Sequence, residues 1–166
     1  SLSLELAARM LHLSGVAPAM DAARNKGRDT LASGAGLRKL QEVSGLQGGD
    51  PRVCDDPGLL PRARETVDLR SQCDGRVTGI ACRAVGLAAM LLGAGRETVD
   101  SRVDPAVGLV LLKKVGDPVA KGEPFLTIHV NDKRRLDAVV QILKDAVKIG
   151  PEAPPKAPLI RDVLHG

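Results

Sequence analysis

The first sixty residues carry apolar positions at helical intervals and contain no strand pattern. Leucines, alanines and a methionine recur three, four and seven positions apart over residues 2–13, which predicts an apolar helix. A more polar helix is predicted from Pro18 to about residue 31, with the proline in its first turn. A third, short helix is predicted over residues 37–46. Because the first helix is too apolar to lie alone on a surface, we expect it to pack against a larger body.

Beyond residue 64 the chain changes to short segments typical of strands. Asp74-Gly75 predicts a turn, and Gly79 interrupts one strand as a bulge. The string from Val115 to Pro124 predicts two tight turns around one short strand. The longer predicted strands are residues 65–69, 76–82, 106–114 and 125–130.

The last part of the chain begins with an amphipathic helix that Asp132 is predicted to cap. Its apolar stripe comprises Leu136, Val139, Val140, Leu143 and Val147. A final strand is predicted to start at Ile149. A proline-rich tail follows, with prolines at 151, 154, 155 and 158, and we expect it to dock along the domain surface near Leu159-Ile160.

Glycine and proline are dense between residues 47 and 62, which predicts a connector. We therefore divide the chain into a helical part with linker, residues 1–60, and an α+β domain, residues 61–166. Asp55 and Asp56 are adjacent in the connector, and paired carboxylates can bind a cation. An Asp-Asp-Pro-Gly sequence more often forms a turn in which the carboxylates are exposed to solvent. No metal site is assigned.

The chain is organised around the stretch Gly86–Glu97, in which an apolar segment ends abruptly at glycines. The apolar half predicts a helical turn buried on several sides and stopped by Gly93 and Gly95. Such a turn gives a fixed base for a mobile lid or a partner-binding loop. The simpler interpretation is a buried helix with an ordinary glycine cap. Arg96 is expected to pair with an Asp or Glu on a neighbouring element, near Glu97 or on a partner domain.

Composition narrows the classes of function. Of the 166 residues, 43% are hydrophobic and 27% charged, which is globular composition. There is one Phe and no Trp or Tyr, so nucleic-acid bases have almost nothing to stack on. The net charge is only +4, and the Lys and Arg residues are scattered along the chain, so neither nucleic acid nor a membrane is predicted as a partner. With no signal peptide or long apolar run, we expect a cytoplasmic protein. The missing initiator Met suggests a piece of something longer.

Several familiar site motifs are missing from the sequence. Three cysteines without C-x-x-C spacing indicate reduced thiols rather than zinc or disulfides. No phosphate loop or nucleophile elbow occurs. The string over residues 115–128 resembles the hammerhead half-barrel of biotinyl and lipoyl carrier domains. The candidate lysines, Lys113 and Lys114, lack the exposed hairpin that carries the cofactor in those domains.

One pentapeptide, Arg-Glu-Thr-Val-Asp, occurs twice, at residues 64–68 and 96–100. The flanking residues differ, because one copy leads into a predicted strand and the other follows the glycine turn. We interpret the repetition as a coincidence and not as a repeat architecture.

A longer series of strings runs through nearly the whole chain: L-E-L-A-A-R-M-L, L-A-S-G-x-x-L, Q-G-G-D-P-R-V-x-D-D-P, L-P-R-A, D-G-R-V, V-G-L-A-A-M-L-L-G-A-G-R, D-P-A-V-G-L and K-K-V-G-D-P-V-A-K-G-E-P. In this order they resemble the C-terminal portion of bacterial-type pyrimidine-nucleoside (thymidine) phosphorylases. The combination of A-A-M-L-L-G-A-G-R with K-K-V-G-D is the specific part of the likeness.

The resemblance implies a pentosyltransferase of nucleoside salvage, in which phosphate displaces the base from thymidine or uridine. It implies a base-binding helical domain, a phosphate-binding α/β domain, and a cleft that closes and excludes water. Residues 1–60 would be the last helices of the α/β domain. Residues 61–166 would be a C-terminal α+β domain with a barrel-sandwich, hammerhead-like sheet. The family's catalytic residues lie upstream, so no catalytic residue is assigned here and the chain alone should be inactive.

Within this chain the resemblance assigns a cleft-closing loop, formed by Gly93, Ala94, Gly95, Arg96 and Glu97. It implies inorganic phosphate as co-substrate, no other cofactor, and partners consisting of a pyrimidine nucleoside, missing N-terminal domains and a second subunit of a homodimer. Some family members hold a structural cation. At that place this chain has Ala22, beside Asp21, where a Glu is common, so no cation is assigned.

Two other classes of function stay open at this point. The chain could be a stand-alone structural or binding module that docks through the apolar helix of residues 2–13. It could also be a carrier domain modified on Lys113 or Lys114. Nothing in these residues separates a preference for thymidine from one for uridine.

Overall fold

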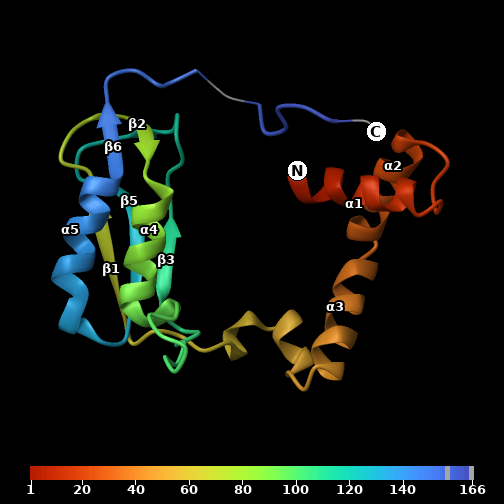
Figure 1. The fold of residues 1–166 in the computed structure, drawn as a ribbon, viewed down its shortest axis with the longest axis horizontal. Helices are drawn as coiled ribbons and strands as arrows, with labels where there is room; N and C mark the ends of the chain where they lie inside the picture. The colour runs from red at the N-terminus through yellow and green to blue at the C-terminus, as the bar shows by residue number, and fades with distance from the viewer. Residues whose placement is uncertain (156–157, 165–166) are drawn as a thin grey trace. The chain divides into compact units, whose positions relative to one another are not determined.

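The computed structural model describes residues 1–155 and 158–164 of the chain (Figure 1). Within these residues the chain forms two compact units, one of residues 1–59 with 158–164 and one of residues 60–155. The first unit is helical, and the second contains all the strands of the described residues. In the described part of the chain no helix is both long and apolar enough to cross a membrane.

The first unit contains the three predicted helices, α1 (Leu2–Leu13), α2 (Met20–Ala32) and α3 (Ala35–Leu46). The prediction that Pro18 lies in the first turn of the second helix is wrong. Ala19 is extended, with φ −143° and ψ 157°, so α2 begins only after it. Pro18 therefore precedes the helix and removes no hydrogen bond from it.

Helices α1 and α2 pack closely because small residues line their contact. A Cβ atom on Gly27 would lie 2.8 Å from Leu4 Cδ1, so only glycine fits there without a shift. The outer face of α1 is different, since Met10 is 71% and Leu13 is 85% exposed. The described residues therefore do not form the larger body expected to cover α1. The buried residues of the helical core are Ala8, Ala17 and Ala23.

The connector after α3 is ordered by its aspartates. Two short 3-10 turns, Pro51–Cys54 and Pro57–Leu59, follow the helix. Asp56 Oδ1 accepts a hydrogen bond at 2.8 Å from the backbone N–H two residues further on. Asp55 Oδ2 accepts one at 2.8 Å from Gln41 Nε2. Both carboxylates therefore act as local hydrogen-bond acceptors, in agreement with the turn interpretation of this sequence.

The second unit is built from six strands, β1 (Glu65–Arg70), β2 (Gly75–Ile80), β3 (Gly108–Leu111), β4 (Pro118–Val119), β5 (Pro124–Val130) and β6 (Val147–Gly150). They form two three-stranded antiparallel sheets, with strand orders β1-β5-β3 and β4-β2-β6. Two helices complete the unit, α4 (Cys82–Ala89) and α5 (Leu136–Ala146) (Figure 1). The predicted α+β class is confirmed.

Strand β5 lies at the centre of the core, because β1 and β3 pair with its two edges. Helix α5 adds its apolar stripe, in which Val139 and Leu143 are fully buried. Val77 of β2 belongs to the same buried cluster, so both sheets share one core. The buried residues of β5 are Phe125, Leu126, Ile128 and Val130.

Three element boundaries differ from the predictions. The strand predicted to reach Cys82 ends at Ile80, because α4 already begins at Cys82. Val147 belongs to β6 rather than to the helical stripe, since its register pairs it with Ile80. Asp132 caps the 3-10 turn Lys133–Arg135 and not α5 itself.

Other predictions for this unit are confirmed or narrowed. The bulge at Gly79 is confirmed, because the β2–β6 register shifts between Val77 and Gly79. The strand predicted over residues 106–114 covers only 108–111. The described part of the proline-rich tail forms no helix or strand, and Leu159 is exposed. Residues 158–164 group with the helical unit, where Ile160 and Val163 line a pocket together with Leu13 of α1. Residues 156 and 157 of that tail lie outside the described residues.

Candidate functional site

Helix α4 ends in a distinctive turn at the glycines. It passes directly into a π-helical turn, Met90–Ala94, in which Gly93 has φ +102°. Residues with side chains rarely adopt this conformation, which explains a glycine at this position. Gly95 is extended again, and the chain leaves the helix there. Single π turns occur frequently at functional sites, and this one replaces the simple glycine cap of the alternative interpretation.

Only one side of this segment is buried. Ala88 and Leu92, four positions apart, belong to the core cluster. Leu87 is 45% exposed, so the prediction of burial on several sides is wrong there. The reason is that α5 and β3 contact α4 from the core side. The π turn is therefore fixed to the core by one face and faces solvent with the other.

Asp104 closes the base of the loop that leaves the π turn. Its backbone N–H donates to Gly93 O at 2.9 Å. Its carboxylate accepts hydrogen bonds from Ala106 N–H at 2.9 Å and from Asn131 Nδ2 at 2.7 Å. The bond from Asn131, then that from Ala106, holds the pKa of the Asp104 carboxyl below its usual value, against the opposing effect of desolvation. The ionised carboxylate thus ties the end of the loop to the end of β5.

The outer part of the loop, residues 95–103, has fewer contacts. Thr98 N–H donates to Ser101 Oγ at 3.0 Å and forms a local turn. Glu97 forms an ion pair with Arg135, next to the start of α5. Val99 lies between these contacts and is 87% exposed. The loop therefore has a fixed base, one ionic contact and an exposed apolar tip.

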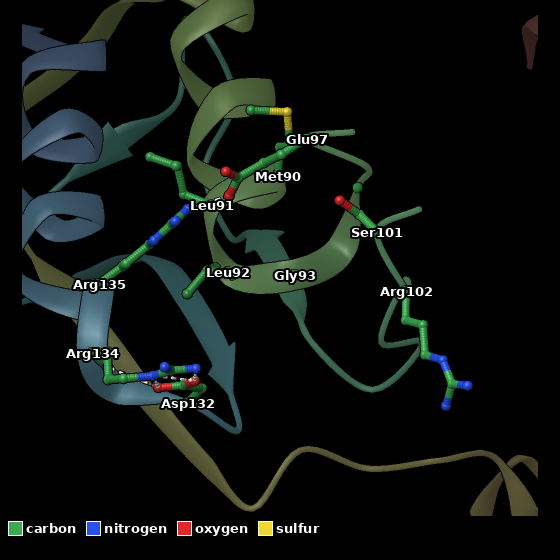
Figure 2. A pocket seen from close by; sticks show the side chains of 11 residues that line it. Met90, Leu91, Leu92, Gly93, Glu97, Ser101, Arg102, Asp132, Arg134 and Arg135 are labelled. Atoms are coloured by element: carbon green, nitrogen blue, oxygen red, sulfur yellow. Dashed lines mark hydrogen bonds and ion pairs between the residues drawn. The ribbon is translucent and has the colours of Figure 1, made fainter. Parts of the chain in front are cut away.

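A pocket of about 390 Å³ lies between this loop and the turn that precedes α5 (Figure 2). The π turn supplies apolar lining from Met90, Leu91 and Leu92. The loop supplies Glu97, and the turn before α5 supplies Arg135, which extends toward Leu91 in Figure 2. The pocket thus combines an apolar wall with charged side chains.

The charges around the pocket are largely paired with one another. Arg134 Nε donates to Asp132 Oδ2 at 2.8 Å, and the Arg134 guanidinium lowers the pKa of the Asp132 carboxyl to about 2. Arg135 is paired with Glu97. Arg102 is directed away from the other two arginines (Figure 2). Because two of the three guanidinium groups are neutralised, the pocket is not a strong anion site.

Only some of the five predicted loop residues line the pocket. Gly93, Gly95 and Glu97 line the pocket, whereas Ala94 and Arg96 are not among its lining residues. Among the described residues no ion pair involves Arg96, so its predicted carboxylate partner is not found within this part of the chain. Glu97 makes the ionic contact instead, because it faces the start of α5.

Three residues of the site were not found from the sequence: Asp104, Asn131 and Arg135. The Asp104–Asn131 contact joins residues 27 positions apart, and the Glu97–Arg135 contact joins residues 38 positions apart. Helical and strand periodicities report only near neighbours. The one local signal is Asp104 before Pro105, a turn-forming pair.

The structure offers little support for a metal or a carrier lysine. Among the described residues, no group of three or more His, Cys, Asp or Glu side chains is arranged to hold a metal ion. Asp21 is paired with Arg24 at 2.9 Å. Lys113 is paired with Glu123 at 2.6 Å, and its side chain is only 20% exposed. An attachment lysine must reach an enzyme, so this position does not suit one.

Comparison with known families finds a match within the second unit. Residues 76–150 match the family of the pyrimidine nucleoside phosphorylase C-terminal domain. This segment is therefore similar to that family. It runs from β2 to β6 and contains the π turn, the loop and the whole pocket. The candidate site therefore lies inside the segment that matches this family.

Outside residues 76–150 the chain is also similar to curated pyrimidine-nucleoside phosphorylases. The chain is 41% identical over 163 residues to the one from Bacillus subtilis, covering 98% of this chain and 37% of the relative. It is 42% identical over 159 residues to that from Geobacillus stearothermophilus, covering 96% and 36%. For Staphylococcus epidermidis the identity is 39% over 148 residues, covering 89% and 34%. The chain spans little more than a third of these relatives, and its resemblance to their C-terminal portion is confirmed.

Proposed function

We propose that this chain is the C-terminal part of a pyrimidine-nucleoside phosphorylase. The supporting observation is 41% identity along 98% of the chain to a relative of that name. In the proposed reaction an oxygen of inorganic phosphate bonds to C1′ of thymidine or uridine while the C1′–N bond breaks. The products are pentose 1-phosphate and the free base, which takes up a proton. Phosphate is the co-substrate, and the reaction needs no other cofactor.

The proposed role of this chain is structural, without a group that touches the reacting atoms. The loop Gly93–Glu97 helps to close a substrate cleft against the part of the enzyme that precedes these residues. The fixed base of this loop at the π turn, and the exposed Val99 two residues after it, support this role. Closure excludes water, so that phosphate and not hydroxide reaches C1′.

The proposal includes a barrel-sandwich arrangement of the hammerhead type for the two sheets. Each sheet has three short antiparallel strands. Val77 of β2 and Ile128 of β5 lie in one buried cluster, which supports two sheets that face a common core. The bulge at Gly79 bends β2, as a strand at the end of a small barrel requires.

The intact protein is proposed to be a cytoplasmic homodimer that binds a pyrimidine nucleoside and phosphate. Catalytic groups come from the part that precedes this chain. The exposed apolar face of α1, with Met10 and Leu13, supports such a neighbour, because contiguous apolar surface usually marks a contact. Three free cysteines suit a reducing compartment.

A chimaera tests the proposed function. In it this chain replaces the aligned 163 residues of the Bacillus subtilis relative. We expect phosphate-dependent release of thymine or uracil from the chimaera, and none from this chain alone or from the truncated relative. If the chimaera unfolds cooperatively but releases no base, the proposed function is wrong. Turnover by this chain alone would refute the location of the catalytic groups upstream.

Intact mass distinguishes a carrier function. After expression with the biotin and lipoyl ligases, we expect the unmodified mass, because Lys113 is held by Glu123. An adduct located on Lys113 or Lys114 would support the carrier function in place of the phosphorylase.

A further inference from the structure

One short turn contacts both the start of β1, which follows the connector, and the loop of residues 93–104, called the glycine loop below. This turn, residues 131–135, follows β5 and contains the 3-10 segment that leads into α5. It contacts two segments that are far apart in sequence, the start of β1 and the loop between Gly93 and Asp104.

On the linker side, the turn binds the residues at the start of β1. The Arg64 N–H donates to Asn131 Oδ1 at 2.7 Å. Lys133 Nζ lies 2.5 Å from Glu65 Oε2. Residue 64 is only a few positions from Leu60, where the second unit begins. These contacts therefore fix the point at which the connector enters the unit.

On the loop side, the same turn binds both ends of the glycine loop. Asn131 Nδ2 donates to Asp104 Oδ2 at 2.7 Å, and Asp104 N–H donates to Gly93 O at 2.9 Å. Arg135 forms the ion pair with Glu97. Glu65 and Glu97 are the second residues of the two Arg-Glu-Thr-Val-Asp copies, and each pairs with a cation of this turn.

The chemistry of Asn131 makes it the centre of this arrangement. A backbone N–H is only a donor, so Arg64 must meet the amide oxygen. An ionised carboxylate is only an acceptor, so Asp104 must meet the amide nitrogen. The planar amide of Asn131 thus contacts the start of β1 and the glycine loop at the same time. If the amide rotates to improve its bond to Arg64 or to Asp104, it breaks the other bond. Its bond to a charged, half-buried partner is stronger than the exposed ion pairs around it.

We propose that the 131–135 turn is a positioning element that couples the start of β1, where the connector enters the second unit, to the loop of residues 93–104, so that a displacement of the start of β1 displaces the loop. The coupling itself does not depend on the proposed function. Its expected effect on kcat rests on the proposed role of the loop in closing the cleft. Neither Asn131 nor Arg135 acts on substrate. Both act through the loop, by setting where Gly93 and Glu97 lie.

Amide exchange on the 166-residue chain tests the coupling directly. Asn131→Ala should speed exchange by about ten-fold in two separate places, at residues 62–65 and at 96–106, while β5 and α5 keep their protection. Arg135→Glu should speed exchange about three-fold or more in residues 96–103 alone. The charge swap Glu97→Arg with Arg135→Glu should restore the original rate. Lys144→Glu, the same charge reversal on α5 away from the turn, is the matched control and should leave the loop unchanged.

Two results would overturn the inference. One is faster exchange at only one of the two places in Asn131→Ala. The other is a charge swap that fails to restore the loop when the single reversal has loosened it. The charge swap preserves both charges, so this second test remains valid even if Asn131→Ala does not fold.

Kinetics in the chimaera separate this inference from the proposed function. If the loop closes the cleft, Arg135→Glu should lower kcat by about ten-fold with little change in KM, and the charge swap should restore kcat. An active chimaera whose kcat does not respond, although exchange responds as expected, would refute the closing role of the loop and support the coupling. An inactive chimaera with the expected exchange would refute the phosphorylase function alone.

Discussion

Gly75 offers the most direct test of how strands β2 and β6 are held together. It begins β2, the central strand of its sheet, where it pairs with β4 while the next residue pairs with β6. A Cβ atom at Gly75 would lie 2.7 Å from Gly150 O and 2.9 Å from Ile149 Cγ2. The first of these atoms is backbone and cannot rotate away. Gly75→Ala must therefore push β6 from β2.

The size of the effect follows from this contact. Overpacking that moves backbone costs about 1–3 kcal/mol. Each ladder hydrogen bond lost between β2 and β6 adds about 1 kcal/mol. An alanine also makes the unfolded chain less flexible, which returns about 0.4–1 kcal/mol. We therefore expect the free energy of unfolding of the second unit to fall by about 2–3 kcal/mol.

Gly79 provides a matched control in the same strand. A Cβ atom there would meet nothing within 4 Å. Gly79→Ala has the same effect on the unfolded chain as Gly75→Ala, so the difference between the two variants isolates the clash. We expect Gly79→Ala to be neutral or to stabilise by at most about 1 kcal/mol.

Native-state amide exchange in increasing urea measures each unit separately. Peptides from β5 report the second unit, and peptides from α2 report the first. With a urea slope of about 1–3 kcal/mol per molar, Gly75→Ala should lower the β5 midpoint by roughly 1–2 M and leave α2 unchanged. Equal midpoints for the two glycine variants would refute the proximity of β2 and β6 at Gly75.

Three further variants test the core, the turn and the loop. Leu126→Ala should cost about 2–5 kcal/mol in the same exchange assay, because Leu126 is fully buried and its removal leaves a cavity; a smaller loss would contradict its central position. The pKa of Asp132 is lowered to about 2, so the stability it contributes is complete above its unfolded value near 4 and is lost as pH falls toward 2. Asp132→Asn should therefore flatten stability between pH 4 and pH 2, and an unaltered pH profile would contradict its pairing with Arg134. Gly95→Val in the chimaera should reduce turnover by about ten-fold and impair turnover more than stability. The new Cβ would lie 3.3 Å from Met90 Cβ and 3.4 Å from Met90 Cα, so the exposed loop has to shift away from the π turn; unchanged kinetics would favour an inert glycine stop.

Strands and helices with strong local patterns were predictable from the sequence. The alternation at Val67 and Leu69 and the apolar run from Phe125 gave β1 and β5 almost to the residue. The start of α4 was not predictable, because its cap is Ala81, which has no side-chain acceptor to mark it. Val147 fits the helical stripe as well as a strand. Its pairing with Ile80 decides the matter, and the helical pattern contains no information about that partner.

The candidate site was predictable only where backbone conformation needs glycine. Gly93 marks the π turn through its positive φ, so the sequence indicates a break there. Asn131 and Arg135 gave no signal, since an amide and a guanidinium at the start of a helix are ordinary surface residues. Their importance depends on Asp104 and Glu97, and only the folded chain brings these residues together.

The two copies of Arg-Glu-Thr-Val-Asp show what a local sequence can and cannot specify. At 64–68 the pentapeptide enters an extended ladder, because β5 offers its Thr127, Ile128 and His129 as partners. At 96–100 the same residues form an irregular segment that belongs to no helix or strand. The same five residues therefore adopt different backbone conformations in the two places, so the pentapeptide alone does not determine its conformation. The copy that pairs with β5 becomes a strand, and the copy outside the sheets stays irregular, with its valine exposed to solvent.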